Sequence, residues 1–277
     1  MSEQSNDTDS LYYQNVDVNS RDRVGHTPLH IAILNHCNTK IIALLLTRGA
    51  DPNARDSMGY TPLQVAIFEY YSIEIIALLL DHGADPNIPI MDGYTALHNA
   101  IINYNNELVS LLLDHGADPN VENYCKNTPL HTAIVYRNMD VIELLLNHGA
   151  NPNIQNKNGI TILHDAVFEI YDEDTYTINF KLIQLLLRHS ANPNIQNKNG
   201  TSPLDLAESN IGFLSHLPEQ QKNVIQLLLT YNRKLFRLVC VGLKPHNLGL
   251  NSLLLIGQQM KLLPDKDLSD IILKCLC

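Results

Sequence analysis

The sequence predicts an all-α solenoid of six helix-turn-helix repeats with β-turn fingers and a small C-terminal helical cap, because two strings recur in phase along the chain. The string T-P-L-H, intact or degraded, begins at Thr27, Thr61, Thr95, Thr128, Thr161 and Ser202, in steps of 33, 34 or 41 residues. The string G-A-D-P-N or a close variant begins at Gly49, Gly83, Gly116, Gly149 and Ser190, and a leucine triplet stands before each copy. One such unit cannot bury its own apolar face, so neighbouring units are expected to stack.

The T-P-L-H string predicts the start of the first helix of each repeat. The Thr27 hydroxyl can cap a helix, and Pro28 suits the first helical position because that position needs no N–H partner. Leu29 and Ile31 then begin an apolar stripe. A small residue recurs at one position of the stripe and would let neighbouring helices approach closely: Ala32, Ala66, Ala100, Ala133, Ala166 and Ala207.

The leucine triplets predict the second helix of each repeat. They run over 44–46, 78–80, 111–113, 144–146, 185–187 and 227–229. Each leucine that becomes fully buried stabilises the fold by about 1.5–3 kcal/mol. Glycine then supplies the left-handed residue after the helix, and Asp-Pro-Asn prevents the helix from continuing.

The period divides the chain into eight segments. Residues 1–23 are expected to be disordered or to form an N-terminal cap, and 16–22 match the A-D-P-N loop of a missing earlier repeat. The repeats are expected at 24–57, 58–91, 92–124, 125–157, 158–198 and 199–232. The fifth carries an insertion within 169–179, whose acidic residues 172–174 are expected in a solvated loop, and the sixth is degenerate. Residues 233–277 are expected to form short helices.

Charge and composition narrow the function classes. The net charge of −10 disfavours nucleic acid as a partner, and the sum is −14 for residues 1–230 but +4 for 231–277. No apolar run is long enough to span a membrane, and the N-terminus lacks the features of a signal peptide. Five irregularly spaced cysteines favour a reducing compartment over disulfides or zinc. We therefore expect a cytoplasmic monomer that binds neither membrane nor nucleic acid.

The twelve histidines are expected to be structural. Four close the T-P-L-H strings and four end the second helices, so copies lie one repeat apart, about 10 Å, which is too far to share a metal ion. No nucleophile elbow, phosphate-binding glycine loop or zinc-protease motif is present. The sequence thus predicts no enzyme activity, no cofactor and no metal.

These strings resemble the ankyrin repeat, and the resemblance covers about residues 17–232. It implies a β-turn, two antiparallel helices and a return loop in each repeat, and a concave face that binds another protein. Exposed positions that vary between repeats are the candidates for recognition. At the finger tips they are Arg55, Met58, Tyr60, Ile88, Met91, Tyr94, Asn123, Tyr124, Lys126 and Ile160, and near the ends of the first helices His36, Glu69, Tyr70, Tyr104, Tyr136, Arg137 and Tyr171.

Four of these candidates are tyrosines at nearly corresponding positions, where ankyrin repeats usually carry glycine or a small polar residue. They are Tyr70, Tyr104, Tyr136 and Tyr171. Exposed tyrosine and arginine are typical interface anchors. Packing of these rings against the neighbouring repeat is the alternative interpretation.

The last residues resemble the opening of an F-box, a Leu-Pro entry followed by an amphipathic helix, carried by Leu263, Pro264, Leu268, Ile271, Ile272 and Leu276. Ankyrin repeats followed by such a PRANC-type segment are similar to effectors of poxviruses and of Orientia-type intracellular bacteria. The resemblance implies secretion into a host cell, a host target on the ankyrin face, and recruitment of a cullin–RING ubiquitin ligase through its Skp-type adaptor. The alternative is a stoichiometric binder or decoy whose C-terminus only caps the solenoid.

Overall fold

The computed structural model describes residues 13–168, 173–209, 223–224 and 226–230, and it falls into two units, Met1–Asn151 and Pro152–Cys277. In the N-terminal unit the first helices of successive repeats are α2 (Pro28–Leu34), α4 (Pro62–Phe68), α6 (Ala96–Ile102) and α8 (Pro129–Val135). The second helices are α3 (Thr39–Thr47), α5 (Ile73–Asp81), α7 (Asn106–Asp114) and α9 (Met139–Asn147). The described part of the chain contains helices and no strands, as predicted.

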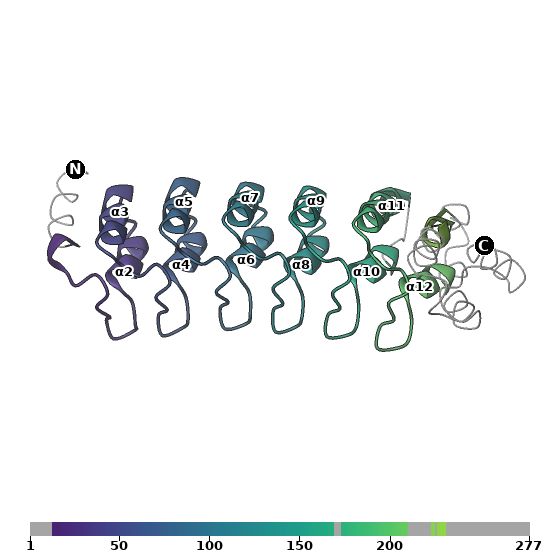
Figure 1. Ribbon diagram of the computed structural model, residues 1–277, viewed down its shortest axis with the longest axis horizontal. Coiled ribbons are helices and arrows are strands. Elements are labelled where there is room, and N and C mark those ends of the chain that lie inside the picture. The colour runs from purple at the N-terminus through teal and green to yellow at the C-terminus, as the bar shows by residue number, and fades with distance from the viewer. Residues whose placement is uncertain (1–12, 169–172, 210–222, 225, 231–277) are drawn as a thin grey trace, which may run out of the picture. The chain divides into compact units, whose positions relative to one another are not determined.

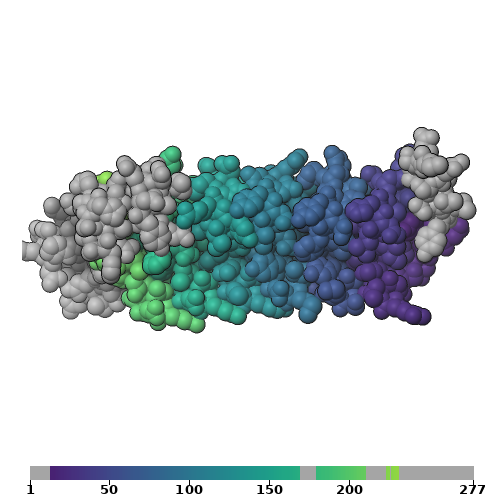
Figure 2. Space-filling model, turned by 180° about the vertical axis from the view of Figure 1, so that it is seen from behind, coloured from purple at the N-terminus to yellow at the C-terminus, as the bar shows by residue number. Residues whose placement is uncertain are grey.

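The four helix pairs of the N-terminal unit stack side by side. Each first helix contacts its own second helix and the first helix of the next repeat, and the second helices contact one another in the same way. A finger projects between consecutive pairs, below the helices in Figure 1. Figure 2 shows the same repeats from behind as adjoining bands from purple to teal.

Local capping explains why each helix begins where it does. The Thr61 hydroxyl accepts a hydrogen bond from the amide of Gln64 at 3.3 Å, and the Gln64 side-chain oxygen accepts one from the Thr61 amide at 2.9 Å. This reciprocal pair is a capping box, and Pro62 occupies the first turn. The second helices α3, α7 and α9 are capped by asparagine: Asn38 Oδ1, for example, accepts from the amide of Ile41 at 3.1 Å.

The leucine triplets form the core between the helix layers, but their three members are not equivalent. Leu112 is fully buried and Leu113 nearly so, whereas Leu111 is half-buried. The same order holds in the other triplets from 44–46 to 185–187. The recurring small residue Ala100 is also fully buried, as its role in close helix approach requires.

An asparagine ladder joins the loops that follow the second helices. Asn53 Nδ2 donates to the carbonyl of Gly83 at 2.8 Å, and Asn53 Oδ1 accepts from the amide of Asp85 at 2.7 Å. Asn87 makes the same pair of bonds to the next repeat, at 3.0 and 2.7 Å. The third residue of Asp-Pro-Asn therefore links each repeat to its successor, besides ending the helix.

Residues 13–23 lie against the first repeat. Asn19 makes the first rung of the ladder, with Nδ2 donating to Gly49 O at 3.0 Å. Tyr13 is buried, and the Arg48 guanidinium donates to the carbonyls of Tyr13 and, at 3.1 Å, of Val16. Residue 19 thus occupies the place of the asparagine in an earlier A-D-P-N loop.

The C-terminal unit contains α10 (Ile162–Phe168), α11 (Glu173–Arg188) and α12 (Pro203–Ser209). Helix α11 has 16 residues, against 9 in each second helix of the N-terminal unit. The insertion therefore lengthens the second helix at its N-terminal end. The expectation of a loop is wrong for Glu173 and Asp174, which begin this helix, while Asp172 and Tyr171 lie outside the described residues.

Candidate functional site

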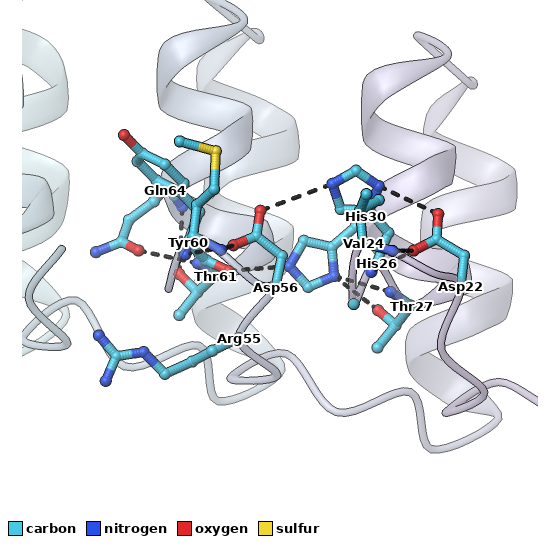
Figure 3. A network of polar contacts seen from close by, with 12 residues as sticks. Asp22, Val24, His26, Thr27, His30, Arg55, Asp56, Tyr60, Thr61 and Gln64 are labelled. Carbon is cyan, nitrogen blue, oxygen red and sulfur yellow. Dashed lines mark hydrogen bonds and ion pairs between the residues drawn. The ribbon is translucent and has the colours of Figure 1, made fainter. Parts of the chain in front are cut away.

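Buried His30, His98 and His164 each tie the first helix of their repeat to the finger of the next repeat. The Thr27 amide donates to His30 Nδ1 at 3.2 Å, so Nδ1 is an acceptor and Nε2 carries the hydrogen. Nε2 then donates to the carbonyl of Tyr60, in the next finger, at 3.1 Å. Figure 3 shows this chain of contacts across the first two repeats. The histidine of T-P-L-H is thus a neutral strut between repeats.

Burial keeps these histidines neutral. It lowers the pKa of His98, which has no exposed surface, from 6.5 to about 4, against the weaker opposing effect of the bond to the Asn127 carbonyl. Burial also lowers the pKa of His30 and of His164. Gln64 replaces histidine in the second repeat and makes equivalent bonds, with Nε2 donating to Ile88 O at 2.6 Å.

A second set of histidines ends the second helices. His115 Nδ1 donates to the Leu111 carbonyl at 2.9 Å, and Nε2 lies 3.2 Å from Asp81 Oδ1 of the preceding repeat. The bond to the Leu111 carbonyl and then the Asp81 carboxylate raise the pKa of His115. His148 likewise has one carboxylate neighbour, Asp114, at 3.7 Å. Within the described residues no three histidine, cysteine or acidic side chains converge as a metal site requires.

Four of the predicted recognition residues help to hold the fingers in place. The Arg55 guanidinium donates to the carbonyls of Gly59, at 3.1 Å, and of Pro89 in the next finger. Tyr60 and Tyr94 are half-buried, and Tyr60 packs edge-to-face on Phe68 at 5.3 Å between ring centroids. Arg55 is exposed, as predicted. Tyr60 and Tyr94 were predicted to be exposed, but they pack on Phe68 and His98 of the first helices. The same prediction is wrong for Asn123, which is buried because its Oδ1 accepts from the amides of Cys125 and Asn127 within its own finger.

The finger tips carry exposed apolar side chains. Met58, Met91 and Tyr124 expose 58, 69 and 65 % of their surface. In the N-terminal unit, two pairs of neighbouring fingers are joined by backbone hydrogen bonds beneath their tips, from the Ser57 amide to the Val24 carbonyl at 3.0 Å and from the Tyr124 amide to the Asp92 carbonyl at 3.2 Å. Lys126 has φ of +60° at the position where the fingers before and after it carry glycine. The tips therefore present apolar side chains to water.

Two tyrosines occupy a strained position at the other end of the first helices. We call the connections between first and second helices, residues 35–38, 69–72, 103–105 and 136–138, the helix-turn edge. Tyr70 and Tyr104 both have φ of +54° there, with 80 and 62 % of their surface exposed. A side chain in this left-handed conformation costs about 1–2 kcal/mol relative to glycine. Arg137 has the equivalent conformation, with φ of +52°.

Neighbour packing accounts for only part of this edge. Tyr136 precedes the strained position by one residue, is half-buried, and packs edge-to-face on Tyr104 at 5.4 Å. His36 pairs with Glu69 at 3.6 Å and stacks on Tyr71. The packing alternative therefore applies to Tyr136, whereas most of the surface of Tyr70 and Tyr104 remains uncovered.

An apolar row that the sequence analysis did not single out lies beside these tyrosines. Phe68 and Val135 end the first helices α4 and α8 and expose 40 and 76 % of their surface. Leu34 occupies the same position at the end of α2. A signal for this row was present, since an apolar residue recurs seven positions after each threonine of T-P-L-H.

Family models match most of the chain. The model for three copies of the ankyrin repeat matches residues 2–90 and 87–156, and the single-repeat model matches 158–198. The chain belongs to the ankyrin-repeat family. Ankyrin repeats form protein–protein interaction modules, so the surfaces described above belong to a protein-binding scaffold. No curated protein matches the chain.

Solved ankyrin-repeat structures resemble the chain along most of its length. The ankyrin repeat domain of Bcl-3, described as a unique member of the IkappaB protein family, is 29 % identical with a TM-score of 0.59. That match covers 73 % of this chain and 86 % of the Bcl-3 domain. An ankyrin repeat domain from Acinetobacter baumannii AYE is 27 % identical with a TM-score of 0.60, over 74 % of this chain and 97 % of that domain.

The predicted F-box-like residues lie beyond both the ankyrin matches and the described residues: Leu263, Pro264, Leu268, Ile271, Ile272 and Leu276. Among the residues that are described, no helix is long and apolar enough to cross a membrane.

Proposed function

We propose that this ankyrin-repeat protein is a non-enzymatic scaffold that holds a partner protein on the finger tips and the helix-turn edge. The observation that carries the proposal is the exposure of Tyr70 and Tyr104 at a left-handed backbone position. Glycine would relieve the strain there with little loss of buried surface, the largest loss being the contact of Tyr104 with Tyr136. Residues that lower the stability of the fold and whose side chains remain mostly exposed are characteristic of binding sites.

The test is affinity capture from cell lysate with the full chain, followed by mass spectrometry. The control for Tyr70→Gly with Tyr104→Gly is Glu143→Ala, which alters an exposed residue in the middle of helix α9, outside the helix-turn edge. The wild type and the control should retain a specific partner, and the double variant should retain at least about tenfold less of it. A partner held equally by all three would refute a role for this edge.

We further propose that the chain acts as a secreted effector in a host cell. The ankyrin face would select a host protein, and the C-terminal segment would recruit a cullin–RING ubiquitin ligase through a Skp-type adaptor. Support comes from the sequence alone: the Leu263-Pro264 entry, the apolar spacing that follows it, and the change from a negative to a positive charge after residue 230.

Pull-down with a Skp-type adaptor tests the ligase proposal. Binding to the wild type that is lost in Leu263→Ala with Pro264→Ala would support it. Absence of binding, or binding unchanged in that variant, would refute it and leave a stoichiometric binder whose C-terminal segment caps the solenoid. In that case deletion of residues 246–277 should preserve the cellular effect, provided that circular dichroism shows the repeats still folded.

A further inference from the structure

The middle repeats of the N-terminal unit carry charge of one sign only. Between Arg55 and Lys126 the chain contains ten carboxylates and not one lysine or arginine. The ten are Asp56, Glu69, Glu74, Asp81, Asp85, Asp92, Glu107, Asp114, Asp118 and Glu122. A surface of this kind attracts cationic partners and repels anionic ones.

Three of these carboxylates lie in, or just after, the two turns of the helix-turn edge that carry the strained tyrosines. Glu69 immediately precedes Tyr70, and Glu74 follows it in the first turn of α5. Glu107 lies in the first turn of α7, three residues after Tyr104. Lys40 lies in the first turn of α3 and Arg137 in the turn before α9, so this acidic, aromatic patch has a cation at each border.

The two kinds of side chain favour the same ligand group. An exposed tyrosine ring attracts a guanidinium or ammonium group to its face, and attracts it more strongly when the contact is desolvated. Carboxylates beside the ring add charge-assisted hydrogen bonds, for which the planar guanidinium is the best donor. A purely apolar segment would instead have to desolvate the three carboxylates without replacing their partners.

The repeat spacing limits the shape of such a ligand. Packed helices lie about 8–10 Å apart, so Tyr70 and Tyr104 stand on adjacent turns at about that separation. A polyproline-type extended chain rises about 3.1 Å per residue and returns to the same face every third residue. Side chains at positions i and i+3 of such a chain are therefore about 9 Å apart and point the same way.

We propose that the helix-turn edge binds an extended segment of the partner protein with arginine or lysine at positions i and i+3, one cation at each of Tyr70 and Tyr104. This assignment rests on the proposed function, because it names the chemistry of the segment that the same edge holds. Because Lys40 and Arg137 repel cations at the two borders, the site that binds cations is limited to the turns of Tyr70 and Tyr104.

Selection from a random-peptide library on the immobilised full chain tests the proposal. Peptides enriched on the wild type should carry an excess of arginine and lysine at i and i+3 and should weaken as ionic strength rises. Tyr70→Gly with Tyr104→Gly should lose them. Glu69→Lys with Glu107→Lys should lose the basic preference.

A matched control separates a local site from the overall negative charge. Asp81→Lys with Asp114→Lys makes the same change in net charge at the C-terminal ends of α5 and α7, away from the helix-turn edge. It should leave the basic enrichment at least about half intact, since screening limits charge effects to about 8 Å at physiological salt. Equal loss in the two charge variants would overturn the proposal.

The two proposals fail in different ways. Enriched peptides that require Tyr70 and Tyr104 but carry no basic excess would overturn the cationic segment and leave the binding edge in place. Enriched peptides that bind without these tyrosines, or no enrichment on the wild type, would overturn both.

Discussion

Replacement of His98 by glutamine should make the N-terminal unit more resistant to acid without changing its stability at neutral pH. The wild-type chain provides the precedent, because Gln64 occupies the equivalent position in the second repeat and bonds the same groups. Glutamine at position 98 can therefore accept from the Thr95 amide and donate to the Asn127 carbonyl, as the neutral histidine does.

The magnitude follows from the two protonation equilibria. In the unfolded chain His98 takes up a proton below its ordinary pKa of 6.5, whereas burial holds the folded pKa at about 4. The unfolded state therefore binds more protons between these two pH values. The contribution of His98 to stability is fully present above pH 6.5 and is lost as the pH falls. One pKa unit corresponds to about 1.4 kcal/mol, so the loss from this residue is about 2 kcal/mol at pH 5 and about 3 kcal/mol at pH 4.

Urea unfolding followed by circular dichroism, together with hydrogen exchange at the amides of α6, measures the effect. Between pH 7 and pH 5 the wild type should lose about 2 kcal/mol more than His98→Gln. His115→Gln is a control of opposite sign, because the raised pKa of His115 gives stability that is present below pH 6.5 and lost as the pH rises. Equal acid sensitivity of His98→Gln and wild type would refute the conclusion that His98 links the repeats as a buried, neutral histidine.

Three further predictions concern the packing of the N-terminal unit, and urea unfolding tests each of them. Gly93→Ala should destabilise by about 1–3 kcal/mol more than Gly59→Ala, because both have positive φ but only at Gly93 would the new Cβ lie 2.8 Å from the backbone of the next finger; equal losses would contradict the close approach. Leu112→Ala should cost about 2–5 kcal/mol and Leu111→Ala less than half as much, and the reverse order would exclude the burial described. Tyr70→Gly should raise the unfolding free energy by about 0.5–1 kcal/mol, whereas a decrease would mean that the ring packs in solution.

The repeat architecture could be predicted from the sequence because its signals are local and repeated. Threonine caps, leucine triplets and Asp-Pro-Asn stops each act within one turn of helix, and every copy strengthens the same phase. The long-range role of two motif residues was not predictable from one copy. Asn53 and His30 both bond a carbonyl one repeat away, which only stacking places within reach.

The binding surface was predictable only in part. Variation between repeats identified Tyr70 and Tyr104, which are exposed, but also Arg55 and Tyr60, which hold the fingers. Sequence variability cannot distinguish these cases, because the outcome depends on whether a neighbouring finger carbonyl or ring lies within reach. The extension of α11 through Glu173 was missed for a similar reason, since an insertion can lengthen a helix or a loop.

The most direct test of the account is a paired measurement on Tyr70→Gly with Tyr104→Gly: retention of the captured partner protein and unfolding free energy, on the same preparation. The account predicts that partner retention falls by about tenfold or more while the unfolding free energy stays equal to that of the wild type or rises. Unchanged retention would show that these tyrosines do not hold the partner. Loss of retention together with loss of stability would show that they serve the fold.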